Sequence, residues 1–340
     1  METVQQTTGQ GTEWGPCPEE IDMTEESIAV VFPGQGTQRR GMGKDFYDNV
    51  DISKKTYEEA SDALGWDVAA LCFEDDERIN LTEYAQPGIV ATEIAMFRGI
   101  QSLYDFQPHY FGGHSLGEYT GLVAAGAIPF SDTLKTVQMR GRLMQQATPP
   151  GTGGMAAVIG PDLDIGKIRK ILEDLPIDVA NINSTHQVVL SGAADSIKIA
   201  ETRLIEAFAD AHAEETFRFV PLNVSAPFHS RFMVTIRDTF RDVLTAASAK
   251  FNAGRANRVT SNYSGAFHSG STSNIIEALV SQVSSAVNWR DNMTALAGKA
   301  QKIYEIGPNR PLKNFFSSIH VPCKSITNFS TAKRVFATGG

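Results

Sequence analysis

Short apolar runs of the kind that form buried strands alternate along this chain with longer stretches of helical spacing. Ile28 to Phe32 is an apolar, β-branched run and predicts a buried strand. His109 to Gly113 and Lys302 to Ile306 predict two more strands, and residues 44–64 predict a helix. Another helix is predicted from Gln86-Pro87 to about Tyr104, because proline favours the first turn of a helix. These elements indicate an α/β protein.

The pattern changes after Pro149-Pro150-Gly151, which breaks the preceding helix and predicts a subdomain boundary. Strands and helices are then expected in the order β-α-β-β-α-β, at 155–159, 164–175, 178–182, 187–190, 193–211 and 216–220. That order is the ferredoxin-like arrangement. The sequence therefore predicts a small ferredoxin-like subdomain at 153–220, inserted between two parts of a larger one at 27–152 and 221–330.

The last third of the chain returns to helical spacing. Helices are expected at 231–247, 274–285 and 288–299, and a strand around Arg258 to Asn262. Gly265 to Ser273 is rich in Gly and Ser and predicts a flexible loop. No pattern remains from about Ser330, so residues 331–340 are expected to be an irregular tail.

Charge is concentrated at the start of the chain. Residues 1–26 hold seven acidic side chains and no Lys or Arg, which predicts a disordered acidic leader. Removing these seven from the 39 acidic residues leaves 32, against 30 Lys and Arg. The overall net charge of −9 is therefore misleading, because the folded body is nearly neutral and would not strongly repel an anionic partner.

Composition narrows the class of protein. With 42% hydrophobic and 20% charged residues, the chain is typical of soluble globular proteins, and no apolar run is long enough to span a bilayer. Cys17, Cys72 and Cys323 are odd in number and widely spaced, so they fit neither a disulfide framework nor a metal motif. A reducing compartment is expected, either the cytoplasm or an organellar matrix.

Gly113-His114-Ser115-Leu116-Gly117 matches G-x-S-x-G between a predicted strand and a helix-forming run from Glu118 to Ala127. This spacing is typical of a sharp strand-to-helix turn that presents a nucleophilic serine. At the start of a helix, the Leu116 backbone N–H can face a developing oxyanion. Alone the motif is weak, because an ordinary βα turn has the same composition.

A serine nucleophile needs a base, and His229 ranks first among the seven histidines. Ala226-Pro227-Phe228 holds it in a rigid turn where the chain re-enters the larger subdomain. His114 is expected to pack, since neighbours in a tight turn point apart, and His268 lies in the Gly/Ser-rich loop. Four histidines are expected to be solvated: His109, His186, His212 and His320.

A series of further segments accompanies the serine motif in a fixed order. They are Phe32–Gln38 (FPGQGTQ), Gln86-Pro87, Gly113–Tyr119, Met139-Arg140-Gly141, Asn181–Asn183, Val224–His229, Gln282–Trp289 and Tyr304–Pro308. Over roughly residues 27–328 the chain thus resembles the malonyl-CoA:acyl carrier protein transacylases of type II fatty acid synthesis, which are stand-alone relatives of polyketide-synthase acyltransferase domains. The resemblance implies an α/β-hydrolase-like larger subdomain with an inserted ferredoxin-like one.

The resemblance also implies a catalytic centre. Ser115 would take the malonyl group as an ester, with His229 as general base and then general acid. A main-chain carbonyl at Gln282, rather than a carboxylate, would take the third role of the triad. The backbone N–H groups of Gln35 and Leu116 would form the oxyanion hole.

Arg140 is implied to pair with the free carboxylate of the malonyl group. Malonate differs from acetate by that carboxylate, and a buried arginine can bind it in a bidentate manner. Three more side chains would bind substrate in the same pocket: Gln86, Asn183 and Phe228. Glu118, in the first turn after the serine, is expected to be structural or to complement the helix dipole rather than to act as a catalytic acid.

The predicted reaction is a ping-pong transfer of malonyl from malonyl-CoA to the phosphopantetheine thiol of an acyl carrier protein, supplying fatty acid elongation. The expected partners are the coenzyme A thioester and the carrier protein, without a metal, bound cofactor, nucleic acid or membrane, and the enzyme is expected to be a monomer. An acidic carrier would contact basic residues that flank the motifs, namely Arg39, Arg40, Arg310 and Lys313.

Three other interpretations stay open. A serine hydrolase or thioesterase shares the serine turn, but would favour an acidic triad member and would not need Arg140. A polyketide-type acyltransferase would use another acyl-CoA. A catalytically silent partner protein on this fold is disfavoured, because Ser115, His229 and Arg140 are all present.

Overall fold

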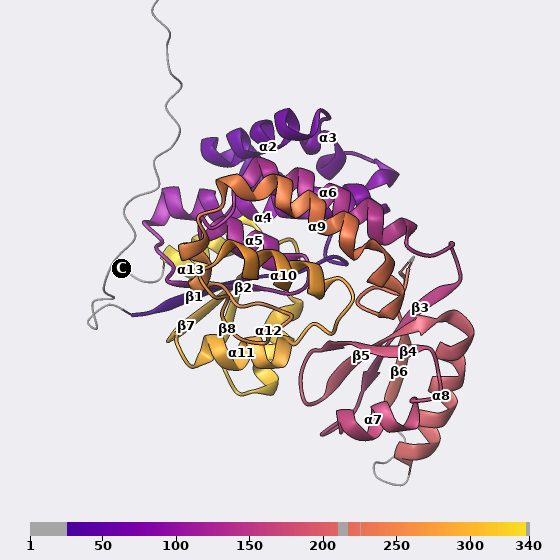
Figure 1. Cartoon of the computed structure of the whole chain (residues 1–340). Helices are drawn as coiled ribbons and strands as arrows, with labels where there is room; N and C mark the ends of the chain where they lie inside the picture. Colours follow the sequence, from indigo (N-terminus) through magenta and orange to yellow (C-terminus); the bar gives the residue numbers. More distant parts are fainter. Residues whose placement is uncertain (1–25, 210–216, 225, 338–340) are drawn as a thin grey trace, which may run out of the picture.

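The structure, a computed structural model, describes residues 26–209, 217–224 and 226–337 and contains two separate β-sheets (Figure 1). One sheet is parallel and the other antiparallel, so the chain has a mixed α/β architecture. The predicted leader up to residue 25, with Cys17, lies outside the described residues. His212, Ser225 and the last three residues of the predicted tail lie outside them too.

The parallel sheet has the strand order β2-β1-β7-β8. Its strands are β1 (Ile28–Phe32), β2 (Tyr110–Gly113), β7 (Lys302–Ile306) and β8 (Cys323–Ile326). β1 pairs with β2 so that Phe32 lies opposite Gly113. The loops that follow these two strands therefore leave the sheet side by side, at its carboxyl edge.

Helices cover both faces of this sheet. Successive side chains of a strand point to opposite faces, and those of β1 are all apolar, so both faces need to be covered. Val30 and Phe32 pack with Ile94 and Phe97 of α4 (Thr82–Tyr104), whereas Ala29 and Val31 belong to a second cluster. The second cluster includes side chains of α11 (Trp289–Ala297) and α12 (Pro311–Ser318). Figure 1 shows α11 and α12 on one side of the sheet. On the other side lie α4, α5 (Gly117–Ala124), α6 (Phe130–Gln146), α9 (Arg237–Ala247) and α10 (Thr272–Gln282).

The antiparallel sheet has the order β4-β5-β3-β6. It comprises β3 (Gly153–Ile159), β4 (Ile177–Ile182), β5 (Gln187–Ala193) and β6 (Arg218–Pro221), with α7 (Ile165–Ile171) and α8 (Ala194–Ala209) between them in sequence. Ala156 and Val158 of β3 pack against these helices, whereas Met155 and Ala157 point to the larger core. One face of the sheet is therefore covered by its own helices, and the other face is turned toward the rest of the molecule (Figure 1).

Several predicted elements were wrong in extent. α4 begins at Thr82, one turn before the predicted start, and Pro87 lies inside it. The predicted 44–64 helix is two helices, α1 (Lys44–Asn49) and α2 (Asp51–Leu64), because Val50 is extended. Around Arg258 to Asn262 only isolated bridges form, such as Val259 to Phe111, so the predicted strand is absent from this described segment.

Near the carboxyl end no strand was predicted where β8 lies, and α13 (Phe329–Ala337) forms where an irregular tail was expected. A short α3 (Val68–Phe73) was also not predicted, and the predicted 231–247 helix starts as a 3-10 helix over Arg231–Ile236. Within the part of the chain that the structure describes, no helix is long and apolar enough to cross a membrane.

Candidate active site

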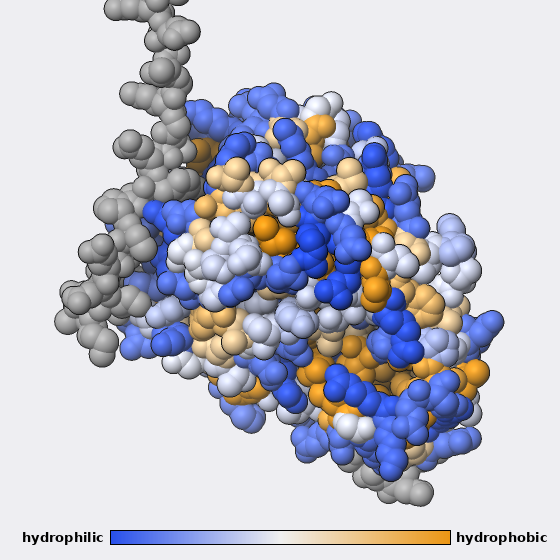
Figure 2. All heavy atoms as spheres, in the orientation of Figure 1, coloured by the Kyte–Doolittle hydropathy of each residue, from blue (hydrophilic) through white to orange (hydrophobic). Residues whose placement is uncertain are grey.

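A cavity of about 590 Å³ lies beyond the carboxyl edge of the parallel sheet, between that edge and the open face of the small sheet. Gln35 and Ser115, which follow β1 and β2, line one wall, and Met155, Asn181 and Val189 of the small sheet line the other. Figure 2 shows that apolar side chains also line a hollow on the surface near the small sheet. The cavity has the size and mixed lining of a small-molecule site.

Ser115 occupies a strained turn between β2 and α5, with φ of 52°. A Cβ atom at Gly113 would lie 2.1 Å from the Gly117 backbone, and one at Gly117 would lie 2.1 Å from the Phe32 carbonyl. Glycine is therefore required on both sides of the serine by close backbone approach. The Ser115 N–H donates to Asn262 Oδ1 at 2.6 Å, which helps to hold the strained turn.

His229 faces the serine from the turn predicted for it. Its Nε2 lies 2.7 Å from Ser115 Oγ, and its Nδ1 lies 2.8 Å from the Gln282 carbonyl oxygen. A carbonyl can only accept, so Nδ1 carries the proton and Nε2 is left as the acceptor facing the hydroxyl. Burial, and then the nearby Arg140 cation, lowers the pKa of His229 to about 3, which keeps the ring neutral.

Arg140 is a buried cation at the same point, 1% exposed, on α6. Its Nη1 donates to Gln86 Oε1 at 2.9 Å, and its Nη2 donates to Gln282 Oε1 at 3.0 Å and to Ser115 Oγ at 3.2 Å. Burial lowers the pKa of the guanidinium, and no carboxylate in the described ranges forms an ion pair with it. A buried cation with neutral partners is a ready site for an anionic group.

The other predicted residues gather around these three. Gln86 Nε2 donates to Gln35 Oε1 at 3.2 Å, which joins α4 to the loop after β1. Asn183 lies across the cavity, where its Oδ1 is 2.8 Å from His114 Nε2, and Phe228 lines the cavity beside His229. Leu116, the residue after Ser115, caps α5. The structure thus brings all nine predicted site residues together.

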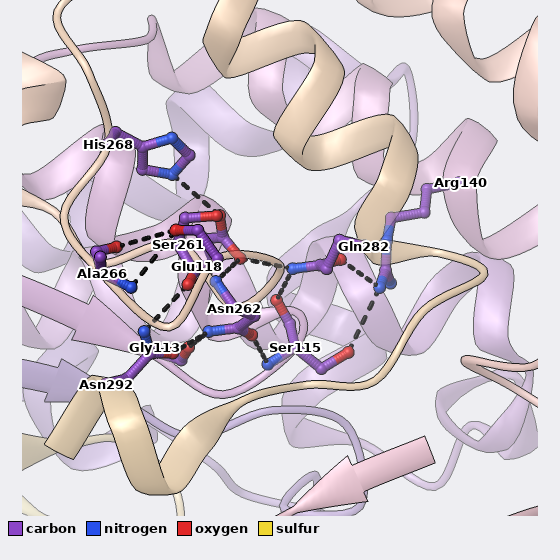
Figure 3. Close-up of polar contacts among 11 residues, drawn as sticks. Gly113, Ser115, Glu118, Arg140, Ser261, Asn262, Ala266, His268, Gln282 and Asn292 are labelled. Carbon is purple, nitrogen blue, oxygen red and sulfur yellow. Dashed lines mark hydrogen bonds and ion pairs between the residues drawn. The ribbon is translucent and has the colours of Figure 1, made fainter. Parts of the chain in front are cut away.

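Two residues of this region, Asn262 and His268, were not predicted to contribute, whereas Glu118 was expected to have a structural role. Figure 3 shows Glu118 between His268 and Gln282, behind the serine turn. The loop predicted around His268 is present, but it is held in place: His268 N–H donates to the Val259 carbonyl at 2.9 Å, and its side chain is 1% exposed. Pairing of buried polar groups, which the local sequence does not reveal, fixes this segment.

His114 packs as predicted, against the rings of Trp289 and Phe315, and it also lines the cavity. His186 and His320 are exposed, and His109 is half-buried.

Comparison with known proteins gives a consistent result. The family model described as "Acyl transferase domain" matches residues 29–311. A malonyl CoA-acyl carrier protein transacylase of Bacillus subtilis is 35% identical over 304 residues, covering 88% of this chain and 92% of the relative.

Two solved structures are similar throughout. An acyl carrier protein S-malonyltransferase from Vibrio cholerae has a TM-score of 0.82 at 34% identity, covering 91% of this chain and 99% of the other. A malonyl-transacylase solved in complex with its type II PKS acyl-carrier protein has a TM-score of 0.83 at 30% identity, covering 92% and 100%. The chain therefore belongs to the acyl transferase domain family, together with the malonyl CoA-acyl carrier protein transacylases.

Proposed function

We propose that this protein transfers a malonyl group from malonyl-CoA to the phosphopantetheine thiol of an acyl carrier protein, through an ester on Ser115. One observation carries the proposal. Ser115 Oγ lies 2.7 Å from the neutral His229 Nε2 and 3.2 Å from the buried Arg140 guanidinium. A nucleophile, its base and a carboxylate-binding cation therefore share one cavity. The names of the relatives, which specify malonyl and acyl carrier protein, support the same reaction.

In the first half-reaction, Ser115 Oγ attacks the thioester carbonyl carbon of malonyl-CoA while His229 Nε2 takes the hydroxyl proton. The carbonyl oxygen becomes an oxyanion, and the backbone N–H groups of Gln35 and Leu116 stabilise it. The C–S bond then breaks, and His229 returns the proton to the departing sulfur. Coenzyme A leaves and the malonyl group stays on Ser115 as an ester.

The second half-reaction runs the same steps with another thiol. The phosphopantetheine thiol of the carrier gives its proton to His229 and attacks the ester carbonyl. The C–O bond to Ser115 breaks, and the serine oxygen recovers the proton from His229. The Gln282 carbonyl, 2.8 Å from Nδ1, keeps the ring in the required tautomer throughout.

Arg140 selects the acyl group. Its guanidinium pairs with the free carboxylate of the malonyl group, and Gln86 orients it through the 2.9 Å hydrogen bond. Asn183 and Phe228 shape the pocket around the acyl chain. Loss of one partner from such a buried charged pair costs about 2–5 kcal/mol, which is enough to reverse the preference for malonyl over acetyl.

The fold supports a finer description of the subdomains. The sheet order β4-β5-β3-β6 agrees with a ferredoxin-like subdomain at 153–220. The parallel sheet with the serine turn after β2 agrees with an α/β-hydrolase-like subdomain at 27–152 and 221–330. We infer that the insertion supplies the second wall of the substrate cavity. Cys72 and Cys323 are free and buried, which agrees with a reducing compartment.

The test is intact-mass spectrometry after brief incubation with malonyl-CoA, followed by addition of holo acyl carrier protein. Wild type should gain one malonyl group and pass it to the carrier thiol, Ser115→Ala should gain none, and Arg140→Ala should lose the preference for malonyl over acetyl. Release of free malonate without a lasting adduct would favour a hydrolase instead. Uptake of a different acyl group in preference would favour a polyketide-type acyltransferase, and no uptake of any would favour a silent partner protein.

A further inference from the structure

Glu118 is a fully buried carboxylate that the reaction does not use. It lies in the first turn of α5, and its side chain is 0% exposed. Its Oε2 accepts from the Asn262 N–H at 3.0 Å and from Gln282 Nε2 at 2.7 Å, and its Oε1 lies 2.8 Å from His268 Nε2. Burying a carboxylate is costly unless all its acceptor sites are filled. An apolar side chain would fill this space at lower cost, so we expect the Glu118 carboxylate to have a specific role there.

Gln282 meets the active site through two different groups. Its backbone carbonyl accepts from His229 Nδ1, whereas its side-chain amide contacts Ser115 and Arg140. Amide Nε2 donates to the Ser115 carbonyl oxygen at 2.9 Å and to Glu118, and amide Oε1 accepts from Arg140 Nη2 at 3.0 Å (Figure 3). The side chain can therefore be removed while the contact to the base is kept.

Glu118 contributes one of the two acceptors that set which way this amide points. An amide nitrogen can only donate and an amide oxygen can only accept. Because Glu118 Oε2 and the Ser115 carbonyl are both acceptors on the same side, the nitrogen must face them, and the oxygen must then face Arg140. Without Glu118, only the Ser115 carbonyl would hold the nitrogen on that side, so the amide would be fixed less firmly. An amide that flipped would lose its hydrogen bond to Arg140, because its N–H groups would face the guanidinium donors.

His268 in turn holds Glu118. It reaches the carboxylate from the loop after Asn262, and its side chain is 1% exposed, so solvent does not compete for the contact. Asn262 ties the same carboxylate to the serine turn, since its backbone N–H donates to Glu118 and its Oδ1 accepts from the Ser115 N–H. The carboxylate is thus fixed relative to the nucleophile on one side and to Gln282 on the other.

We propose that Glu118 and His268 are positioning residues that fix the orientation of the Gln282 side-chain amide and so hold the Arg140 guanidinium where a substrate carboxylate binds beside Ser115. This inference rests on the proposed function, because it concerns selection of malonyl. Neither residue touches the substrate. Their effect appears in the choice of acyl group, and not only in the total rate.

The experiment measures the ratio of initial Ser115 acylation rates with malonyl-CoA and acetyl-CoA, by intact mass. Unfolded molecules acylate with neither substrate, so the ratio is insensitive to partial unfolding of a variant. Glu118→Ala and His268→Ala should each lower the ratio about tenfold, the size expected when a buried hydrogen-bonding group loses its partner. Glu118→Gln and His268→Gln keep an acceptor or donor in place and should restore the ratio to within about threefold of wild type.

A matched control is Glu93→Gln. Glu93 is another fully buried glutamate, bonded to the Thr120 hydroxyl at 2.6 Å, and burial raises its pKa well above the usual value. Glutamine keeps the size of this side chain and an oxygen that can accept from the Thr120 hydroxyl. This variant should keep the wild-type ratio, because Glu93 has no bond to the Gln282 network.

A double-mutant cycle tests the route through Gln282. Gln282→Ala should lower the ratio, and adding Glu118→Ala to it should lower the ratio no further, since the amide that Glu118 orients is already gone. Three results would each overturn the inference. The first is a ratio within about twofold of wild type in both Glu118→Ala and His268→Ala. The second is an additive effect of Glu118→Ala and Gln282→Ala in the cycle, and the third is no recovery of the ratio in Glu118→Gln and His268→Gln. A wild type that takes up no malonyl would instead overturn the proposed function and this inference with it.

Discussion

At the scale of single residues, His229 shows how burial prepares a base. A free histidine has a pKa of about 6.5 and would be about 97% protonated at pH 5. The pKa of His229 is lowered to about 3, so its Nε2 remains able to accept the Ser115 proton at that pH. We expect the rate of Ser115 acylation by malonyl-CoA to change little between pH 7 and pH 5, as measured by intact mass at each pH.

Circular dichroism at each pH is the control that the protein stays folded. An acylation rate that falls about threefold between pH 7 and pH 6 would show that the base titrates like a solvated histidine. The same shift affects stability in a known direction. Between about pH 3 and pH 6.5 the unfolded chain binds a proton that folded His229 does not, so this residue lowers the free energy of unfolding as pH falls through that window.

The predictability of the site differs from residue to residue for a physical reason. Ser115 lies in a compact motif, because the glycines that its strained turn requires are its near neighbours. Gln282 and Arg140 were predicted only through the family resemblance, since a helix-surface arginine has the same local sequence. Asn262 and His268 come from a segment without periodicity, and only the partner Glu118, 150 positions away from His268, explains their burial.

At the scale of elements, the close packing of α6 on the start of α4 holds Arg140 against Gln86. A Cβ atom at Gly141 would lie 2.5 Å from the Thr82 carbonyl oxygen, so Gly141→Ala must move one helix. Alanine gains about 1 kcal/mol of helix propensity over glycine, but overpacking typically costs about 1–3 kcal/mol or more. We expect Gly141→Ala to lower the free energy of unfolding by about 1–2 kcal/mol in urea titrations and to slow malonyl acylation.

Gly88→Ala is the matched control, because Gly88 lies in buried α4 and a Cβ there would meet side chains no closer than 3.5 Å. It should leave stability unchanged or raise it by up to about 1 kcal/mol. Equal losses for the two variants would show that helix spacing at Gly141 is not the limiting contact.

A second element, α12, depends on a carboxylate at the end of β7. Glu305 Oε1 accepts from the Leu312 N–H at 2.8 Å, and its Oε2 accepts from the Lys313 N–H at 3.0 Å and from the Ser325 hydroxyl at 2.8 Å. Burial raises the pKa of Glu305 from 4.5 to about 7. Between these values the folded protein binds a proton that the unfolded chain does not, so the free energy of unfolding falls as pH rises through the window.

We expect this residue to contribute a fall of up to about 3 kcal/mol between pH 4.5 and pH 7, and Glu305→Gln to remove that part of the slope. Urea titrations across the pH range measure it. Glu58→Gln, at an exposed glutamate, should leave the slope as in wild type. If the free energy of unfolding of Glu305→Gln falls with pH as steeply as that of wild type, then Glu305 titrates alike in the folded and unfolded states.

The elements that the sequence predicted well are those with a complete pattern of their own. The side chains of β1 and of β3 alternate between two hydrophobic clusters, one on each face of the sheet. Both faces of these strands are therefore apolar, and their sequences contain no polar positions. β8 is an edge strand in which only Cys323 and Ile326 are buried, so it left a weak signal. α13 has nine residues and depends on tertiary packing, with the Phe336 ring stacked 4.9 Å from Tyr104, and such contacts are not visible in the local sequence.

At the scale of the whole molecule, the two sheets enclose a cavity whose mouth carries positive charge. Arg39, Arg40, Arg310 and Lys313 are all exposed, and they flank the cavity-lining residues Gln38 and Pro311. Arg40 forms only a surface ion pair with Asp75, at 3.6 Å, and such pairs contribute little. The basic residues are therefore available to attract an acidic carrier protein over a distance set by ionic strength.

Only the second half-reaction involves the carrier protein, so measuring the two half-reactions separately distinguishes attraction of the carrier from the chemical steps. Arg310→Glu and Lys313→Glu should each raise the KM for the carrier about threefold at low salt, with kcat nearly unchanged, because an exposed charge contributes under about 1 kcal/mol and acts on encounter. Initial rates at fixed malonyl-CoA and varied holo carrier measure this, and the effect should shrink at higher salt.

Lys170→Glu, at an exposed lysine on α7, is the matched control, since α7 covers the face of the small sheet opposite the cavity. If all three reversals raise the KM alike, the attraction comes from net charge, and the carrier has no preferred side of approach. If Arg310→Glu and Lys313→Glu slow acylation by malonyl-CoA instead, these residues bind the phosphates of coenzyme A, and the carrier contacts lie elsewhere on the molecule.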